Sequence, residues 1–137
     1  DVMPAVLGAA IEHVKAGRMK PIAIIDTVEN PALPGVKPIV ADYPEFSKYL
    51  PWGPFFGVFV VKGTPKDAVD KLVAAYAEGA KHPDFVKLIN DRGFKMMNLS
   101  GGEAETFLKK WQSVTSWIVH EAGIAKKSPA EFNIPKP

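Results

Sequence analysis

The chain has 137 residues, of which 47% are hydrophobic and 23% charged, so it can form one domain with a packed core. Its net charge is +2 with basic and acidic residues interspersed, which excludes the basic block that binding to nucleic acid or to an anionic membrane requires. The absence of cysteine excludes disulfides and thiol catalysis, and no apolar run approaches the ~20 residues that span a bilayer.

The N-terminal third is predicted to hold a helix, a strand and a long connection. Residues 4–16 have apolar side chains at helical spacing, and Gly17 follows as a stop signal. Residues 19–25 are predicted to form a strand. Pro21 is expected at a sheet edge or at the start of the strand, because proline cannot donate a ladder hydrogen bond. Residues 26–51 are rich in proline and have no periodic pattern, which is typical of a functional or disordered connection.

A buried strand that leads directly into a helix is predicted in the middle of the chain. Residues 56–61 are aromatic and β-branched and end at a glycine-containing turn. Thr64 is placed to cap the helix expected over residues 66–80, and Pro65 has the φ favoured at the first helical position. This order predicts an α/β unit.

Three further elements and a tail are predicted after this unit. A helix begins near His82, and a short strand covers residues 94–99. Ser100 and Glu103 form a capping box for a long last helix. The polar, proline-rich residues 128–137 are expected to lie over the surface.

The chain contains no recognisable catalytic or metal-binding pattern. His13, His82 and His120 lie on separate helical segments without a second ligand at metal spacing, which favours surface or capping roles. Gly101 and Gly102 could present amides to an anion, but the capping box explains this pair more simply. No enzyme activity, cofactor or metal is therefore predicted.

An aromatic cluster is the better candidate for a functional site. Its members are Tyr43, Phe46, Tyr49, Trp52, Phe55 and Phe56. The residues alone favour core packing, the usual role of aromatic side chains. The alternative is that some of these rings line a ligand cleft beside exposed backbone amides at Gly53.

Four segments carry a resemblance to a known family. They are residues 11–24 (IEHVKAGRMKPIAI), 31–38 (PALPGVKP), 57–65 (GVFVVKGTP) and 100–124, which runs from SGGE to EAGI. In order and spacing they resemble the substrate-binding proteins of tripartite tricarboxylate transporters, often called Bug receptors. The chain departs from the family's usual wording at Gly35, Lys37, Val61 and Lys62.

The resemblance implies an α/β fold. It would be the C-terminal portion of a two-lobed, type II-like periplasmic binding protein, with helices packed on a short mixed sheet. Residues 1–50 would be a remnant of the second lobe plus the proline-rich crossover. Residues 51–137 would be the C-terminal part of the first lobe and the tail. The chain is thus expected to be a truncated fragment, only the C-terminal half of such a receptor.

The resemblance also implies a periplasmic solute-binding receptor that captures a small carboxylate and passes it to membrane permease subunits. The expected ligand-binding residues are Met3, Pro4, Ala5, Trp52, Gly53, Pro54 and Phe55. The first three are expected at a helix start, where free amides and the positive end of the dipole attract anions.

An alternative function is an interaction module without ligand binding of its own. Exposed strand edges and apolar faces of such a fragment would drive self-association.

Overall fold

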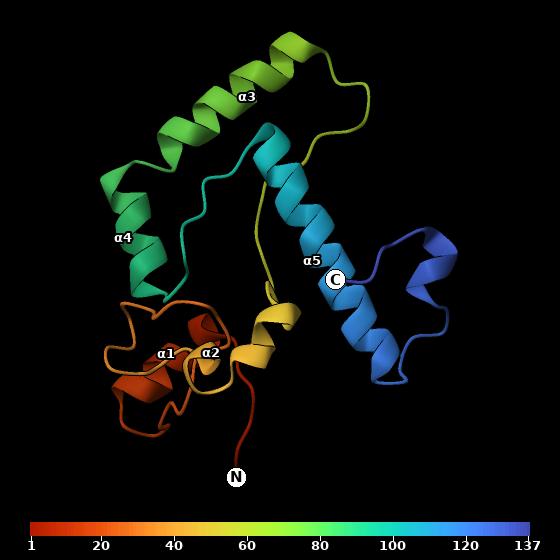
Figure 1. Ribbon diagram of the computed structural model, residues 1–137. Coiled ribbons are helices and arrows are strands. Elements are labelled where there is room, and N and C mark those ends of the chain that lie inside the picture. The colour runs from red at the N-terminus through yellow and green to blue at the C-terminus, as the bar shows by residue number, and fades with distance from the viewer. The chain divides into compact units, whose positions relative to one another are not determined.

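The computed structural model describes residues 1–137, which divide into two compact units. Unit 1 comprises Asp1–Lys20 and Pro54–Ser100, and unit 2 comprises Pro21–Gly53 and Gly101–Pro137. All regular elements are helices (Figure 1). They are α1 (Leu7–Lys15), α2 (Ile39–Asp42), the 3₁₀ helix η1 (Pro44–Tyr49), α3 (Lys66–Gly79), α4 (Pro83–Asp91), α5 (Gly101–Glu121) and the 3₁₀ helix η2 (Pro129–Phe132). No helix combines the length and the hydropathy that crossing a bilayer demands.

The predicted mixed sheet is absent, so the prediction of an α/β fold with helices packed on a sheet is wrong. Of the three predicted strands, residues 56–61 and 94–99 carry no strand pairing at all. Residues 19–25 contribute one isolated parallel bridge, between Ile24 and Pro38. The physical reason is that β-branched and aromatic residues only fit a pleated surface well, whereas a strand forms when a neighbouring backbone pairs with it.

The segment Phe56–Val61, hereafter the apolar segment, is exposed rather than buried. Val58 is 67% exposed, Phe59 68% and Val61 83%. Apolar residues on both faces are typical of a strand enclosed within a sheet. Without paired neighbours, the same pattern leaves an extended hydrophobic stretch in contact with solvent.

The predicted helices are present, and their ends follow from local sequence. α1 begins at Leu7 rather than at Pro4, since Val6 is its N-cap and its carbonyl accepts the amide of Ala9 at 3.0 Å. α4 begins with Pro83 in its first turn, as predicted.

The predicted cap of α3 is wrong. The N-cap residue is Pro65, and no side chain caps the helix. The Thr64 hydroxyl instead donates a hydrogen bond of 2.7 Å to the carbonyl of Val61, which closes the turn before the helix. Ser and Thr often use such local bonds as an alternative to capping.

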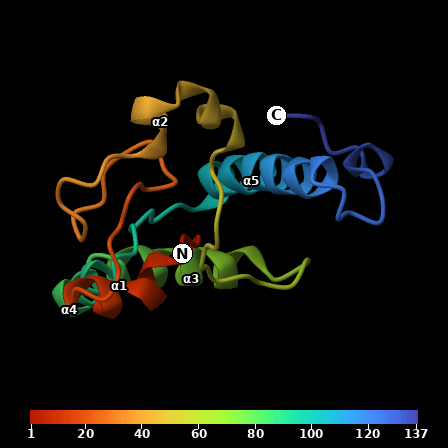
Figure 2. The same cartoon turned by 90° about the horizontal axis from the view of Figure 1, so that it is seen from below.

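Within unit 1, α1 lies close to the end of α4 and the segment that follows it (Figure 2). A Cβ atom added at Gly8 would lie 2.6 Å from Cζ of Phe94 and 3.3 Å from the carbonyl oxygen of Arg92. The Phe94 ring in turn meets Phe56 edge to face at 5.5 Å. A glycine at position 8 is therefore what permits this close approach.

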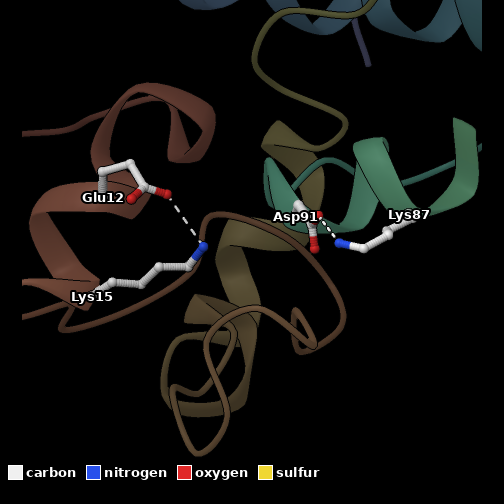
Figure 3. A network of polar contacts seen from close by, with 4 residues as sticks. All are labelled: Glu12, Lys15, Lys87 and Asp91. Atoms are coloured by element: carbon white, nitrogen blue, oxygen red, sulfur yellow. Dashed lines mark hydrogen bonds and ion pairs between the residues drawn. The ribbon is translucent and has the colours of Figure 1, made fainter. Parts of the chain in front are cut away.

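Two ion pairs lie on α1 and α4 of unit 1 (Figure 3). Lys15 Nζ lies 3.2 Å from Glu12 Oε1 on α1, and Lys87 donates to Asp91 on α4. The hydrogen bond from Lys87 lowers the pKa of Asp91, and the positive charge of Lys15 acts in the same direction. Both pairs are exposed, so they add little to stability.

Unit 2 is built around α5, which packs against η1 and η2. Val114 on α5 is fully buried, and Leu50 after η1 is nearly so. Three polar contacts tie the C-terminal tail to α5. They are Ser113 Oγ to the Pro135 carbonyl (2.7 Å), Trp117 Nε1 to the Ile134 carbonyl (3.1 Å) and Lys136 Nζ to Glu121 Oε1 (2.7 Å). A capping box of Ser128 and Glu131 fixes η2 itself.

Candidate functional site

The first three residues expected to bind ligand lie in unit 1. Met3, Pro4 and Ala5 are exposed and precede α1. No side chain caps the start of this helix. The first turn itself starts at Leu7, beyond Met3–Ala5, so an anion site at these three residues stays a prediction.

The other four predicted residues lie where the chain leaves unit 2 and enters unit 1. Trp52 and Gly53 belong to unit 2, and Pro54 and Phe55 to unit 1. The Gly53 carbonyl accepts a hydrogen bond of 2.9 Å from Trp111 Nε1. Gly53 also has a φ of +115°, a conformation that favours glycine. The predicted ligand contacts thus divide between the two units, and their joint role stays a prediction.

The predicted aromatic cluster also divides. Phe46 on η1 meets Tyr43 edge to face at 6.2 Å and Tyr49 at 6.0 Å, all within unit 2. Phe55 and Phe56 belong to unit 1, where Phe55 lies 6.4 Å from the ring of Phe59. Of the rings in unit 2, Phe46, Tyr49 and Trp52 line a common cavity.

A cavity of about 320 Å³ in unit 2 brings these rings together with α5. Its lining is aromatic and aliphatic except for one carboxylate. The lining residues are Ile25, Phe46, Tyr49, Leu50, Trp52, Ile118 and Glu121. Trp52 is 45% exposed, so the cavity is open to solvent on its side. A concave, mostly apolar surface with few polar groups is the usual form of a small-molecule site.

Charged groups surround this cavity. Glu121 forms its ion pair with Lys136 of the tail, and the hydrogen bond from Lys136 lowers the pKa of Glu121. The charges of Lys48 and His120 contribute in the same direction. Lys48 Nζ lies 4.8 Å from the ring centroid of Tyr49. The carboxylate therefore stays ionised at neutral pH, at the edge of an apolar surface.

Of the residues that line the cavity, Trp52 is an expected ligand contact through the family resemblance, and that role stays a prediction; no residue on the α5 side was expected in a site. Glu121 belongs to the family segment 100–124 and carries no site motif of its own. The signal that could have drawn attention to Glu121 is a carboxylate at the end of an otherwise apolar helical face. Its partner Lys136 lies beyond a turn and η2, and local patterns do not report such a contact.

The three histidines have local partners. His13 Nδ1 accepts a hydrogen bond of 3.1 Å from Arg18 Nε, and His82 is the N-cap residue of α4. The His120 ring meets Trp117 edge to face at 5.6 Å. No group of three or more His, Asp or Glu side chains is placed to hold a metal ion.

Comparisons with known proteins give one family. A model of the tripartite tricarboxylate transporter family receptor matches residues 1–124. A UPF0065 protein in the clcB-clcD intergenic region of Pseudomonas knackmussii is 32% identical over 113 residues, which are 78% of this chain and 63% of the relative. A UPF0065 protein in the tcbD-tcbE intergenic region of Pseudomonas sp. (strain P51) is 29% identical over 117 residues, 84% of this chain and 33% of the relative.

The chain thus spans less than two thirds of the length of either curated relative. No solved structure was found to match it. The matched family is one of receptors and not of enzymes, as the sequence predicts. Because the match covers most of the chain, the protein belongs to the family of tripartite tricarboxylate transporter receptors.

Proposed function

We propose that this chain is the ligand-capturing part of a periplasmic receptor that delivers a small carboxylate to the permease subunits of a tripartite tricarboxylate transporter. The single observation that supports this proposal is the family match over residues 1–124. Residues 1–50 would be the remnant of one lobe with the crossover, and residues 51–137 the end of the other. Closure of two lobes about crossover segments is a common way for binding proteins to trap a ligand.

Carboxylate recognition would use Met3, Pro4 and Ala5 before α1 and the stretch Trp52–Phe55. The amides at the start of α1 offer donors and the positive end of a helix dipole. Trp52 offers an exposed ring against which the carbon skeleton of a ligand can pack. Both features suit a small organic acid.

A thermal-shift titration tests this function. The chain and the complete product of its gene are titrated side by side with mono-, di- and tricarboxylates, and with the corresponding amides as neutral controls. A ligand that binds only the folded state raises the melting temperature as its concentration exceeds the dissociation constant. We expect stabilisation by one class of carboxylate and none by its amide. Absence of any shift in both proteins would contradict the proposal.

Variants locate the site in the protein that responds. Trp52→Ala is expected to weaken carboxylate binding about tenfold, since it removes a large apolar contact. Gly79→Ala is the matched control, because a Cβ atom at Gly79 on α3 would meet no atom within 4 Å. Equal affinities for both variants would exclude Trp52 from the site.

A second candidate function, an oligomerising interaction module, is favoured by the exposure of the apolar segment. An extended apolar stretch without paired neighbours can add to a sheet edge of another chain. Light scattering over a range of concentrations distinguishes the two functions. A strict monomer at high concentration would exclude the interaction module.

A further inference from the structure

We propose that the cavity of unit 2 binds a small organic cation of the quaternary ammonium class. Phe46, Tyr49 and Trp52 would form an aromatic cage around the cation, and Glu121 would supply the opposite charge. This site shares Trp52 with the carboxylate site proposed above but uses different chemistry.

Three aromatic residues line the cavity. The rings of Phe46 and Tyr49 meet edge to face, with their centroids 6.0 Å apart and an interplanar angle of 70°, and both residues belong to the lining. Trp52 lines the same cavity as a third aromatic wall. The face of an aromatic ring is negative, and it attracts a cation within about 6 Å of its centroid. Cages of this kind recognise quaternary ammonium groups.

Unit 2 already shows that its rings accept cations. Lys48 Nζ lies 4.8 Å from the centroid of Tyr49, and Lys136 Nζ lies 5.4 Å from that of Trp117. A primary ammonium is strongly hydrated, which limits how far it enters an apolar cavity. A quaternary ammonium has no N–H donors and carries its charge on an apolar surface, so it can enter.

Charge complementarity selects a cation over an anion. Glu121 is the sole charged residue among those that line the cavity. Its Oε1 atom accepts from Lys136 at 2.7 Å, and a carboxylate has further lone pairs on both oxygens for a second cation. Glu121 would repel a carboxylate ligand in the same place, although Lys136 and Lys48 nearby reduce this repulsion. A neutral ligand would gain apolar contact but no Coulombic attraction.

The size of the cavity fits a small molecule. Its volume of about 320 Å³ lies at the lower end of the range of ~300–1,000 Å³ that is common for ligand pockets. A trimethylammonium group with one short substituent is a suitable occupant. Choline is therefore the probe, and its neutral isostere 3,3-dimethylbutan-1-ol is the matched control.

The test is a titration of the ¹⁵N-labelled 137-residue chain, observed at its tryptophan indole N–H signals. Trp111 and Trp117 donate to carbonyl groups outside the cavity lining, and Trp52 lies in that lining. We expect choline to shift the Trp52 signal saturably and to leave the other two nearly unchanged. The isostere should bind about tenfold more weakly, since it lacks the cation–π attraction. Equal affinities, or no saturable shift with choline, would overturn the proposal.

Variants of the two charged residues move the affinity in opposite directions. Glu121→Gln should weaken choline binding about threefold or more, because it removes the opposite charge. Lys136→Gln should strengthen it about two- to fivefold, because Glu121 loses its competing cation. A gain of affinity does not arise from misfolding. Unchanged affinity in Glu121→Gln, or weaker binding in Lys136→Gln, would contradict the assignment of Glu121.

Variants of the rings complete the test. Trp52→Leu keeps an apolar side chain in the cavity but removes the aromatic face, so we expect about tenfold weaker binding of choline and little change for the isostere. Phe132→Leu on η2 is the matched control, as Phe132 is an exposed aromatic residue outside the cavity lining. If both variants bind choline as the parent chain does, Trp52 is not part of the cage.

Discussion

At the scale of single residues, two glycines on helices show how surroundings set the effect of the same substitution. Gly8 on α1 faces Phe94 and the Arg92 carbonyl, and Gly79 at the end of α3 faces open space. Alanine is the better helix former at both positions. The close contact at Gly8 opposes this preference, whereas nothing opposes it at Gly79.

We therefore expect Gly8→Ala to lower the free energy of unfolding by about 1–3 kcal/mol, since the Phe94 ring must move away from its contact with Phe56. Gly79→Ala should raise it by about 0.5 kcal/mol. Urea unfolding followed by circular dichroism measures both. Equal effects of the two substitutions would show that α1 does not pack against Phe94.

A second prediction at this scale concerns two neighbouring hydroxyl groups on α5. Thr115 Oγ1 is buried without a hydrogen-bond partner, whereas Ser113 Oγ donates to the Pro135 carbonyl. Burying an unpaired polar group costs free energy, so Thr115→Val should be neutral or stabilising. Ser113→Ala should lower the free energy of unfolding by about 1 kcal/mol. The reverse order of stabilities, measured by urea unfolding, would refute this account.

At the scale of elements, the tail and α5 act as one piece of structure. η2 caps itself, and the residues after it bind α5 through Ser113, Trp117 and Glu121. Helical periodicity accounts for the face of α5 that meets the core. The tail has no periodicity, so its place on α5 depends on these contacts and on the packing of η2 against the helix.

The ion pair between Glu121 and Lys136 makes the attachment of the tail dependent on pH. Hydrogen bonding to Lys136 lowers the pKa of Glu121 in the folded chain below its usual value of 4.5. At a pH between the lowered pKa and 4.5, the unfolded state binds more protons than the folded state does. The pair therefore stabilises the fold above pH 4.5, and this contribution is lost as the pH falls through the lowered pKa.

We expect Glu121→Gln to have a slightly lower melting temperature than the parent chain at about pH 7 and an equal one at about pH 3. The difference should also shrink in high salt, because the pair is exposed. Lys136→Met is the control. The variant with both substitutions should have a melting temperature close to that of either single variant, because each substitution alone already removes the ion pair. A difference that persists at low pH would show that Glu121 stabilises the tail by another contact.

At the scale of the whole molecule, the apolar segment is the main apolar stretch without strand pairing. Phe59 and Val61 are largely exposed, and no strand pairs with the segment. Its side chains and its backbone would both favour pairing with another chain. The measurable consequence is association that depends on protein concentration.

Sedimentation velocity tests this consequence. Val61→Lys should reduce association, because a charge would be buried in the paired state. Val60→Pro should reduce it by removing a backbone donor that strand pairing requires. Leu72→Lys on α3 is the control, since Leu72 is another exposed apolar residue outside the segment. A loss of association in Leu72→Lys alone would assign self-association to α3 and not to the apolar segment.

The accuracy with which the sequence predicted each element depends on how far apart in the chain the interacting residues lie. The sequence predicted α1, α3, α4 and α5 because helix hydrogen bonds join residues four apart, so local spacing contains the necessary information. The predicted strands failed, because strand pairing depends on residues far away in the chain. Trp52 was an expected ligand contact through the family resemblance, whereas the local aromatic pattern favoured core packing. Glu121 was missed, because what distinguishes it is its ion pair with Lys136 of the tail and its place in the cavity lining.

By itself, the sequence determined the family, the positions of the main helices and the absence of any disulfide. These properties depend on residue identity and on spacing within one or two turns. Only the tertiary structure decided that the apolar segment is exposed, and that Phe46, Tyr49 and Trp52 share a cavity with Glu121. Both depend on which distant segments meet, and that is set by packing rather than by local pattern.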